Sequence, residues 1–588
     1  MFPLTLLLPL LAVSALAAPL ANTTYDFIVV GSGPGGGPLA ANLARAGYTV
    51  LLLEAGTDQG QNPNITQILN FNKAGNDPST RWDFFVKHSS DPSRERKFEH
   101  YVYRQTNGSF YVGNAPPEGA TELGIWYPRA GTLGGCAMHN AGVSVNAPDE
   151  VWDSIAQVTG DEGWRAERMR EHLVRLENAV YAVNDTSHGY GGYLTLSQAK
   201  ALGIGGDVVP EQLLSRDMNA KDAGRDMRTG IFGQIRHADK EGKRVGTNTF
   251  LRATLDDPKK YPLTVSLNSL VTRVLFSNAS IPTAIGVEYQ EGTSLYSADP
   301  RNIGNKIAPT RQAYAAREVI IAGGVFNTPQ ILKLSGIGPA EELKNWNIPL
   351  VLDAPGVGAR LADNYETSII SLAARDLVNV GGTHAVMLKS NSAVAANRTR
   401  DLYLFCGSFS FEGYWPDFPT DYGKSEYECA IVHMNPRSQA GTVELRSSDP
   451  RDIPEINFRF YNESAEADLT DILDGVKWAR KAFANAPQDM RPWKELHPCK
   501  APKLNCIDAE QMEWIKLNTY SHHATSTAQI GADGDEMAVL DGKFRVRGVR
   551  NLRVVDASVF PKIPGAFPVL PTFMISEKAF RDIVADIV

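Results

Sequence analysis

The sequence predicts an α/β fold with two domains: a parallel-stranded domain assembled from segments far apart in the chain, and an α+β domain built on an antiparallel sheet. A strand, a glycine-rich turn and a helix follow one another at residues 25–46, and strand-like runs recur as far as residue 555. Alternating and aromatic residues fill the region from about 368 to 460, which is typical of antiparallel strands. Because 588 residues exceed what one hydrophobic core usually serves, we expect two domains.

The N-terminal unit is βαβ. Residues 25–30 and 48–53 are compact apolar runs, and residues 38–46 between them are small and aliphatic helix formers. Such a unit requires a parallel sheet with helices on its faces. Further strands of this kind are predicted at residues 263–267, 271–276, 319–322 and 552–555. We therefore assign to a discontinuous nucleotide-binding domain residues 25–160, 200–340 and 505–588, and to the second domain residues 161–199, which include a helical stretch, and 341–504.

The composition argues against two classes of ligand. The chain is 43% hydrophobic and 21% charged, with a net charge of -8, as in an ordinary globular protein. Its Lys and Arg residues are dispersed rather than gathered in a basic stripe, so no nucleic-acid binding is expected. Cys and His do not occur at zinc-binding spacings, and we predict no metal site.

The first 17 residues predict a secretory signal peptide. Their apolar run ends at Ala15-Leu16-Ala17 and is too short to span a bilayer, which disfavours a membrane anchor. Asn-x-Ser/Thr glycosylation triplets support a secreted, extracellular protein, and they begin at Asn22, Asn64, Asn107, Asn184, Asn278, Asn397 and Asn462.

The five cysteines are compatible with an oxidising compartment. Cys499 and Cys506 could close a short loop, and Cys406 with Cys429 is the remaining pair. Cys136 would then stay free.

The first βα turn carries a dinucleotide-binding fingerprint. The run GSGPGG at residues 31–36 places Gly31, Gly33 and Gly36 where a tight turn, close approach of a pyrophosphate and helix–strand packing need them. The following helix offers N–H groups and a partial positive charge to the phosphates. Glu54 ends the second strand, where an acid can bond ribose hydroxyls and disfavours a 2′-phosphate. FAD or NAD is therefore expected rather than NADP.

Four further segments decide between these cofactors by resemblance. The run RAGTLGGCAMHN at residues 129–140, the run GGVFNTPQILKLSGIGP at residues 323–339, the strand around Val271 and the VDAS run containing Asp556 resemble flavin-contacting segments of the glucose-methanol-choline (GMC) oxidoreductase family, including its secreted fungal members. The resemblance implies a Rossmann-like FAD-binding domain, a small-molecule substrate, and FAD contacts from Gly134, Gly135, Asn140, Val271 and Asp556. Apart from the resemblance, two consecutive glycines leave room for a flat ring against the backbone.

His139 is placed by the same resemblance at the position where some members bond the flavin covalently. A neutral imidazole is a competent nucleophile toward an activated flavin methyl group, so FAD linked through His139 is expected. A non-covalent contact or a packed histidine is the alternative.

The run SHHATST at residues 521–527 resembles the family's catalytic segment and implies His523 as the base. Alcohol oxidation needs a group that takes the hydroxyl proton as hydride leaves the carbon, and histidine suits this role. His522 is the competitor, but neighbouring side chains of an extended segment point to opposite sides, so we expect only one to face the flavin.

Phe567 stands where the family normally presents a second His or Asn. A phenyl ring accepts no proton, which leaves His523 alone or assisted by a residue such as His522. The ring favours an apolar or aryl alcohol over a sugar. A flavin-retaining lyase or cyclase is the alternative function. For an oxidoreductase, oxygen or a quinone would be the electron acceptor.

Several aromatic residues of the second domain admit two interpretations. They could line a substrate entrance, but alternation along the chain favours a role in the sheet core. The residues are Phe405, Phe409, Phe411, Tyr414, Trp415 and Phe418.

Overall fold

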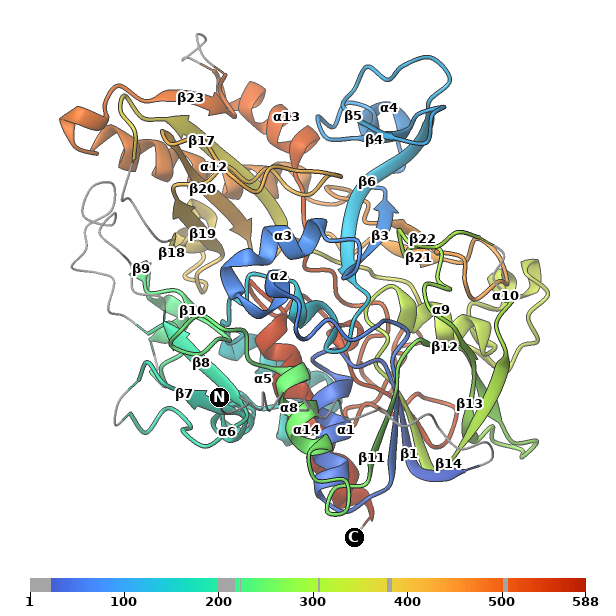
Figure 1. Cartoon of the computed structure of the whole chain (residues 1–588). Helices are drawn as coiled ribbons and strands as arrows, with labels where there is room; N and C mark the ends of the chain where they lie inside the picture. The colour runs from blue at the N-terminus through green and yellow to red at the C-terminus, as the bar shows by residue number, and fades with distance from the viewer. Residues whose placement is uncertain are drawn as a thin grey trace, which may run out of the picture.

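The computed structural model describes residues 23–587, except 183–184, 199–216, 223, 305–306, 378–382 and 501–505. Two large sheets organise this part of the chain (Figure 1). One is mainly parallel and is made of segments from both ends of the chain, and the other is antiparallel and comes from the middle. The predicted α/β class, with a Rossmann-like domain and an α+β domain, is confirmed.

The first sheet begins with the predicted βαβ unit. Strand β1 (Thr24–Val30) is almost continuously buried, as expected for a parallel strand covered on both faces. Helix α1 (Gly36–Arg45) buries Leu39 and Leu43 and returns the chain to β2 (Val50–Leu53), which pairs in parallel with β1. Each predicted run of the N-terminal unit therefore forms the element that its periodicity indicates.

Distant segments complete this sheet. The order is β11-β2-β1-β14-β13-β12, with β24 also paired to β14. The pairs β1–β14, β2–β11 and β14–β24 are parallel, whereas β13 is antiparallel to both of its neighbours. The added strands are β11 (Leu263–Ser266), β12 (Ser269–Phe276), β13 (Ala284–Glu291), β14 (Thr310–Ile321) and β24 (Leu552–Val554).

The antiparallel sheet has the order β23-β17-β20-β19-β18-β9. Helix α12 (Ala465–Ala484) packs against β17, β19 and β20, and its buried face includes Leu469, Ile472 and Val476. The strands are β9 (Gly230–Phe232), β17 (Tyr365–Leu372), β18 (Thr383–Leu388), β19 (Leu402–Gly407), β20 (Glu426–His433) and β23 (Lys494–His497).

Two segments lie differently from the predicted division into domains, whose boundaries otherwise stay a prediction. Strand β9 falls in the range 200–340 but pairs with β18 of the antiparallel sheet. Helix α6 (Ala166–Leu176), in the range 161–199, packs on the C-terminal helix α14 (Val569–Ile587) beside the parallel sheet. The helix in this range ends at Leu176, because residues 177–179 form β7, which pairs with β8 (Leu194–Gln198).

Smaller elements complete the described part of the chain. A four-stranded sheet of order β3-β6-β4-β5 lies at the upper right in Figure 1. Its strands are β3 (Arg81–Val86), β4 (Val102–Arg104), β5 (Phe110–Val112) and β6 (Thr121–Ala130). The remaining strands are β10 (Ile235–Arg236), β15 (Ile337–Gly338), β16 (Leu352–Asp353), β21 (Thr442–Glu444) and β22 (Glu455–Asn457). The remaining helices are α2 (Pro63–Thr66), α3 (Phe71–Asn76), α4 (Pro92–Glu95), α5 (Asp149–Thr159), α8 (Thr247–Leu255), α9 (Asn327–Leu334), α10 (Ala340–Asn345), α11 (Asn391–Ala395) and α13 (Asp508–Asn518).

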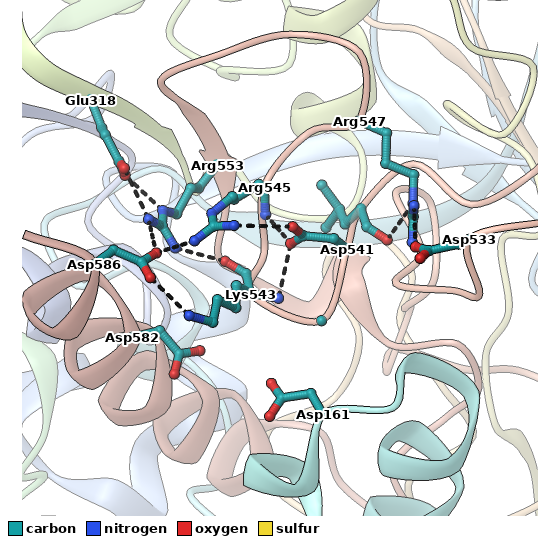
Figure 2. A network of polar contacts seen from close by, with 12 residues as sticks. Asp161, Glu318, Asp533, Asp541, Lys543, Arg545, Arg547, Arg553, Asp582 and Asp586 are labelled. Atoms are coloured by element: carbon teal, nitrogen blue, oxygen red, sulfur yellow. Dashed lines mark hydrogen bonds and ion pairs between the residues drawn. The ribbon is translucent and has the colours of Figure 1, made fainter.

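A network of ion pairs fastens the C-terminal helix to the parallel sheet (Figure 2). Arg553 of β24 has a side chain that is only 1% exposed and donates to Glu318 of β14 and to Asp586 of α14. Asp586 also accepts from Lys543 at 2.8 Å and from Arg545. Burial opposes the charge, but these hydrogen bonds hold the pKa of Asp586 below its ordinary value. We call these five residues the C-terminal clamp.

The cysteine pairing agrees with the sequence prediction. Cys406 and Cys429 form one disulfide between β19 and β20, Cys499 and Cys506 form another, and Cys136 is free. Residues 1–17 lie outside the described residues. Within the described part of the chain, no helix combines the length and apolar character needed to cross a membrane.

Candidate active site

A cavity of about 680 Å³ lies between the two large sheets. Its floor comes from the turn after β1 and from Glu54, Val271 and Asp556, and its other walls come from β19, β20 and the segment around His523. Its size lies within the range of small-molecule and cofactor sites.

The first glycine turn has the geometry that its spacing predicts. Gly31 adopts φ +96°, and a Cβ there would lie 2.2 Å from the carbonyl oxygen of Ala322. A Cβ on Gly33 would meet no atom within 4 Å, which leaves open space directly above the backbone at the N-terminus of α1. Gly36 does not line the cavity, and a Cβ on it would clash with Gly31 and Ala322. Its role is therefore close packing of α1 on the sheet.

Glu54 lies at the end of β2 and lines the cavity. Its side chain accepts hydrogen bonds from the backbone N–H of Ser32 at 3.1 Å and of Gly56 at 2.8 Å, and from the Ser32 hydroxyl. Burial raises the pKa of Glu54, against these hydrogen bonds. The carboxylate is thus held beside the glycine turn, where the fingerprint requires a ribose ligand.

The second glycine loop contacts the first. Gly134 adopts φ +106° and donates its N–H to the Ser32 hydroxyl at 2.9 Å, but it does not line the cavity. Gly135 does line it, and a Cβ there would lie 2.7 Å from Cα of Gly33. The two turns therefore approach so closely that only glycine fits at Gly135.

His139 and Asn140 follow this loop and line the cavity. Burial, followed by Arg129 and Arg244, lowers the pKa of His139 to about 3, so its imidazole is neutral at ordinary pH. The side-chain oxygen of Asn140 accepts from Gly142 at 3.0 Å and from Arg244 at 3.0 Å. Its orientation is therefore fixed by the protein.

Val271 and Asp556 lie on the same side of the cavity as the glycine turn. Val271 belongs to β12. The carboxylate of Asp556 accepts from the backbone of Gly324 at 2.9 Å and from the hydroxyl of Thr328 at 2.6 Å. It therefore joins two of the family-like segments, while its other oxygen accepts from the backbone N–H of Ser558 at 2.8 Å and from the Ser558 hydroxyl.

His523 lines the cavity from the segment that the sequence singled out. Its Nδ1 lies 2.7 Å from Oε1 of Glu366 in β17, and both atoms are buried without an aligned hydrogen bond among the described residues. Because Nδ1 faces the carboxylate, Nε2 is left for a ligand in the cavity. Burial, followed by Arg129, lowers the pKa of His523 to about 3, whereas burial raises the pKa of Glu366 to about 7.

The two adjacent histidines do not point to opposite sides as alternation predicts, and which of them faces the flavin stays a prediction. Both rings line the cavity, with centroids 4.2 Å apart, and Nδ1 of His522 lies 3.8 Å from Glu366. The alternation rule holds for regular strands, but residues 521–524 have no regular secondary structure. His523 N–H donates to Asp363 at 2.8 Å and the carbonyl of His522 accepts from Arg129 at 3.1 Å, which fixes this irregular path.

The aromatic residues of the second domain are only partly a core. Phe405, Phe409, Phe411 and Tyr414 line the cavity, as the interpretation as a substrate entrance expects, and Phe405, Phe411 and Tyr414 also pack against hydrophobic core clusters. Phe418 is buried beside Trp126, and Trp415 stacks on His100, as the core interpretation expects of them. Phe567 also lines the cavity, and its ring stands edge-to-face on His523 with centroids 4.9 Å apart.

Comparison with protein families identifies the chain. The GMC oxidoreductase profiles match residues 101–366 and 436–576, which include most of the segments described above. The chain belongs to the GMC oxidoreductase family. It is a FAD-dependent oxidoreductase with the fold of this family.

Curated GMC relatives match along nearly their whole length. Choline oxidase of Arthrobacter globiformis is 28% identical over 577 residues, covering 95% of this chain and 94% of its own. Alcohol dehydrogenase [acceptor] of Pseudomonas putida is 28% identical over 600 residues, covering 95% and 96%. These names are those of oxidoreductases, which does not favour the lyase or cyclase alternative.

Solved structures share the GMC fold. A formate oxidase superposes with a TM-score of 0.76 at 20% identity, covering 97% of this chain and 99% of its own. A pyridoxine 4-oxidase from Mesorbium loti gives a TM-score of 0.74 at 20% identity, covering 95% and 99%. At such identities the likeness shows the fold.

The residues of this GMC oxidoreductase fit FAD. The open space above Gly33 suits a pyrophosphate at the N-terminus of α1, and Glu54 is held where an adenosine ribose would lie. Gly135 leaves room for a flat ring, with His139 and Asn140 beyond it. Eight of the ten predicted cofactor residues line one cavity, and Gly36 and Gly134 support the two turns from behind. Their individual contacts with FAD stay predictions.

Three cavity residues were missed by sequence reasoning. Glu366 is an acid in the otherwise mainly apolar and hydroxylic strand YETSIISL, and that contrast is a signal that could have found it. Arg129 begins the run at residues 129–140, which was matched to the family as a whole, and no separate role was predicted for this arginine. Arg236 lies on the two-residue strand β10, and no pattern in the sequence distinguishes it from a surface arginine.

Proposed function

We propose that this protein is a secreted enzyme that oxidises an apolar or aryl alcohol to the carbonyl compound, with His523 as the base. The observation that carries the proposal is the arrangement of His523, which turns Nδ1 to Glu366 and lines the cavity beside Phe567. In the reaction FAD, when bound, accepts the hydride from the alcohol carbon, and oxygen or a quinone takes the electrons afterwards.

His523 is suited to take the hydroxyl proton at Nε2. Its imidazole is neutral, because burial lowers its pKa, and it can therefore accept a proton. The imidazolium that forms lies 2.7 Å from Glu366, and an ionised carboxylate at this distance stabilises the positive charge. Glu366 thereby supplies the assistance that Phe567 cannot give. His522, which lies at 3.8 Å from Glu366, is the nearest substitute for the base.

The walls of the cavity support an apolar or aryl substrate. Phe405, Phe409, Phe411, Tyr414 and Phe567 all line it and offer aromatic packing surface to an apolar or aryl group.

Anaerobic mixing tests the reaction. The flavin enzyme is mixed with benzyl, aliphatic and sugar alcohols, and we expect aryl alcohols to bleach the oxidised flavin absorbance most rapidly. Formation of product without bleaching would contradict alcohol oxidation. Reoxidation of the bleached enzyme by oxygen or by a benzoquinone then identifies the acceptor.

We also propose that FAD is linked covalently through His139. The neutral imidazole, which lines the cavity after the second glycine loop, is a competent nucleophile. Acid precipitation of the holoenzyme should leave the yellow flavin in the pellet, whereas precipitation of His139→Asn should release it. Flavin in the supernatant of the unmodified enzyme contradicts the link.

Secretion is supported by the positions of the glycosylation triplets. Asn107, Asn278, Asn397 and Asn462 are exposed, whereas Asn64 is half-buried and donates to Asp77 at 3.1 Å. Asn22 and Asn184 lie outside the described residues. Expression with the native N-terminus should yield glycosylated protein in the medium, and N-glycosidase treatment should lower its mass. Retention of unglycosylated protein inside the cell contradicts secretion.

A further inference from the structure

Arg236 is a buried arginine in the wall of the cavity that has no acidic partner. It ends β10, is 5% exposed and lines the cavity together with Thr383 of β18. Burial lowers its pKa to about 10 against the effect of Tyr403, and burial, followed by the charge of Arg236, lowers the pKa of Arg244. The Arg236 guanidinium is therefore charged at neutral pH, with no carboxylate nearby among the described residues to offset the charge.

The hydrogen bonds of Arg236 are incomplete. Nη2 donates to the side-chain oxygen of Gln234 at 2.7 Å and to the Thr383 hydroxyl at 3.1 Å. Nε and Nη1 are buried and donate to no atom of the described residues. Buried charges in proteins are normally paired, and leaving guanidinium donors unsatisfied is costly. A charged guanidinium with unused donors in a cavity wall is suited to bind an anion.

A chain of side-chain contacts joins Arg236 to the base. Gln234 donates to the hydroxyl of Tyr403 at 3.3 Å, and the Tyr403 ring stands edge-to-face on Phe567 with centroids 4.9 Å apart. Phe567 in turn contacts His523 at the same separation. Arg236 and His523 therefore line one cavity, and Tyr403 and Phe567 are the aromatic residues that connect them.

We propose that the alcohol substrate carries a carboxylate, which Arg236 binds while the hydroxyl-bearing carbon lies at His523. The charged guanidinium offers its unused Nε and Nη1 donors to a carboxylate, and an apolar or aromatic spacer would pack on Phe567. The pyrophosphate of FAD is a second anion in this cavity, but its place is the open backbone at Gly33. This inference rests on the proposed alcohol oxidation and names the class of its substrate.

Binding is tested first, without turnover. The holoenzyme is titrated with benzoate and with methyl benzoate, and the perturbation of the flavin absorbance gives each Kd. We expect benzoate to bind roughly 10- to 100-fold more tightly, as for a charge-assisted hydrogen-bonded pair. Arg236→Met should remove this preference, and Arg236→Lys, which keeps the charge but not the Nε and Nη1 donors, should retain part of it.

Turnover then separates the two proposals. With 4-(hydroxymethyl)benzoate and its methyl ester, Arg236→Met should raise the KM of the acid roughly 10-fold or more and leave that of the ester unchanged. Arg311→Met, which removes an exposed arginine paired with Glu291, is the matched control. Equal use of acid and ester by the unmodified enzyme overturns the inference. Arg236-dependent benzoate binding without flavin bleaching by either alcohol supports the anion site and refutes the proposed oxidation.

If Arg236→Met does not retain FAD, the inference is tested with Arg236→Lys instead. Its flavin spectrum and melting temperature establish that it is folded, and its benzoate Kd is then compared with that of the unmodified enzyme. An unchanged Kd overturns the inference.

Discussion

Buried charged groups are paired with opposite charges in the C-terminal clamp, but two of those in the active-site cavity are not. In the clamp, Arg553 meets two carboxylates, and hydrogen bonds hold the pKa of Asp586 low. In the cavity, Glu366 and Arg236 lack aligned partners of opposite charge, and burial shifts both pKa values against the charged form. The clamp favours its charged groups in the folded state, whereas the cavity keeps groups that a substrate or a proton can use.

The difference explains where each cluster lies. Clamp residues join β14, β24 and the last turns of α14, elements that hold the nucleotide domain together. Cavity residues come from β10, β17 and the irregular segment at 521–524. Unpaired polar groups in the cavity destabilise the fold, and we infer that the paired clamp offsets part of this cost.

The largest effect is expected from breaking the clamp. Arg553→Met leaves Asp586 and Glu318 without their buried partner and should lower the free energy of unfolding by about 4 kcal/mol. Arg545→Met, at a side chain that is 45% exposed, should cost less than about 1 kcal/mol. Urea unfolding of both variants measures the difference. Similar losses would mean that the clamp is a set of ordinary surface pairs.

Removing the base comes next. His523→Ala should slow anaerobic flavin reduction roughly 100-fold or more, which is the usual scale for losing general-base catalysis. Stability should change little, and the clamp variant Arg545→Met should leave the reduction rate unchanged. If His522→Ala slows reduction more than His523→Ala, the base is His522.

A smaller effect on the rate is expected from Glu366→Gln. Because the pKa of His523 is low, its protonation state does not change between pH 5 and 9, whereas Glu366 ionises near pH 7. In the unmodified enzyme kcat/KM should therefore rise as pH increases through about 7. The variant should be roughly 10-fold slower above pH 7 and show a flat profile. A profile that keeps its rise would assign the titration to another group, such as Asp363, whose pKa burial also raises to about 7.

The smallest effect is on stability, and its sign separates the two regions. The pKa of Glu366 is raised on folding, so the folded state holds the proton more tightly and loses stability as pH rises from about 4.5 to 7. Glu366→Gln should thus gain on the order of 1 kcal/mol relative to the unmodified protein at pH 8, and little at pH 4.

Asp586→Asn is the matched variant in the clamp, with the opposite sign. The lowered pKa of Asp586 means that its contribution is present at neutral pH and is lost as pH falls through the folded value. This variant should be destabilised most at pH 7. Parallel pH dependence of the two variants would refute the contrast.

Much of the nucleotide-binding side could be predicted because its constraints are local. Gly31 and Gly33 adopt the geometry that a tight turn needs, and β1, α1 and β2 follow the expected periodicities. Both disulfides were also predicted, because Cys499 and Cys506 lie close enough in the sequence to close a short loop, which left Cys406 with Cys429 as the second pair. Among the predicted cofactor residues, Gly36 and Gly134 do not line the cavity. They belong to the two turns that do and support their packing.

The substrate side was predicted less well, since its groups meet through long-range contacts. Alternation failed for His522 and His523 because hydrogen bonds from distant residues, rather than strand geometry, direct that segment. A core role was favoured for the aromatic residues from Phe405 to Tyr414, but β19 ends at Gly407 and the residues after it follow an irregular path along the cavity, which alternation does not describe.

By itself, the sequence determined the fold class, the glycine turns that line the cavity and the presence of the histidine pair, because strand periodicity, glycine turns and motif order are properties of neighbouring residues. The tertiary structure alone decided which charges meet. Glu366 precedes His523 by more than 150 residues (523 - 366 = 157), and Arg236 reaches the same cavity from another sheet. Pairing across such separations depends on how sheets pack, which no local pattern encodes.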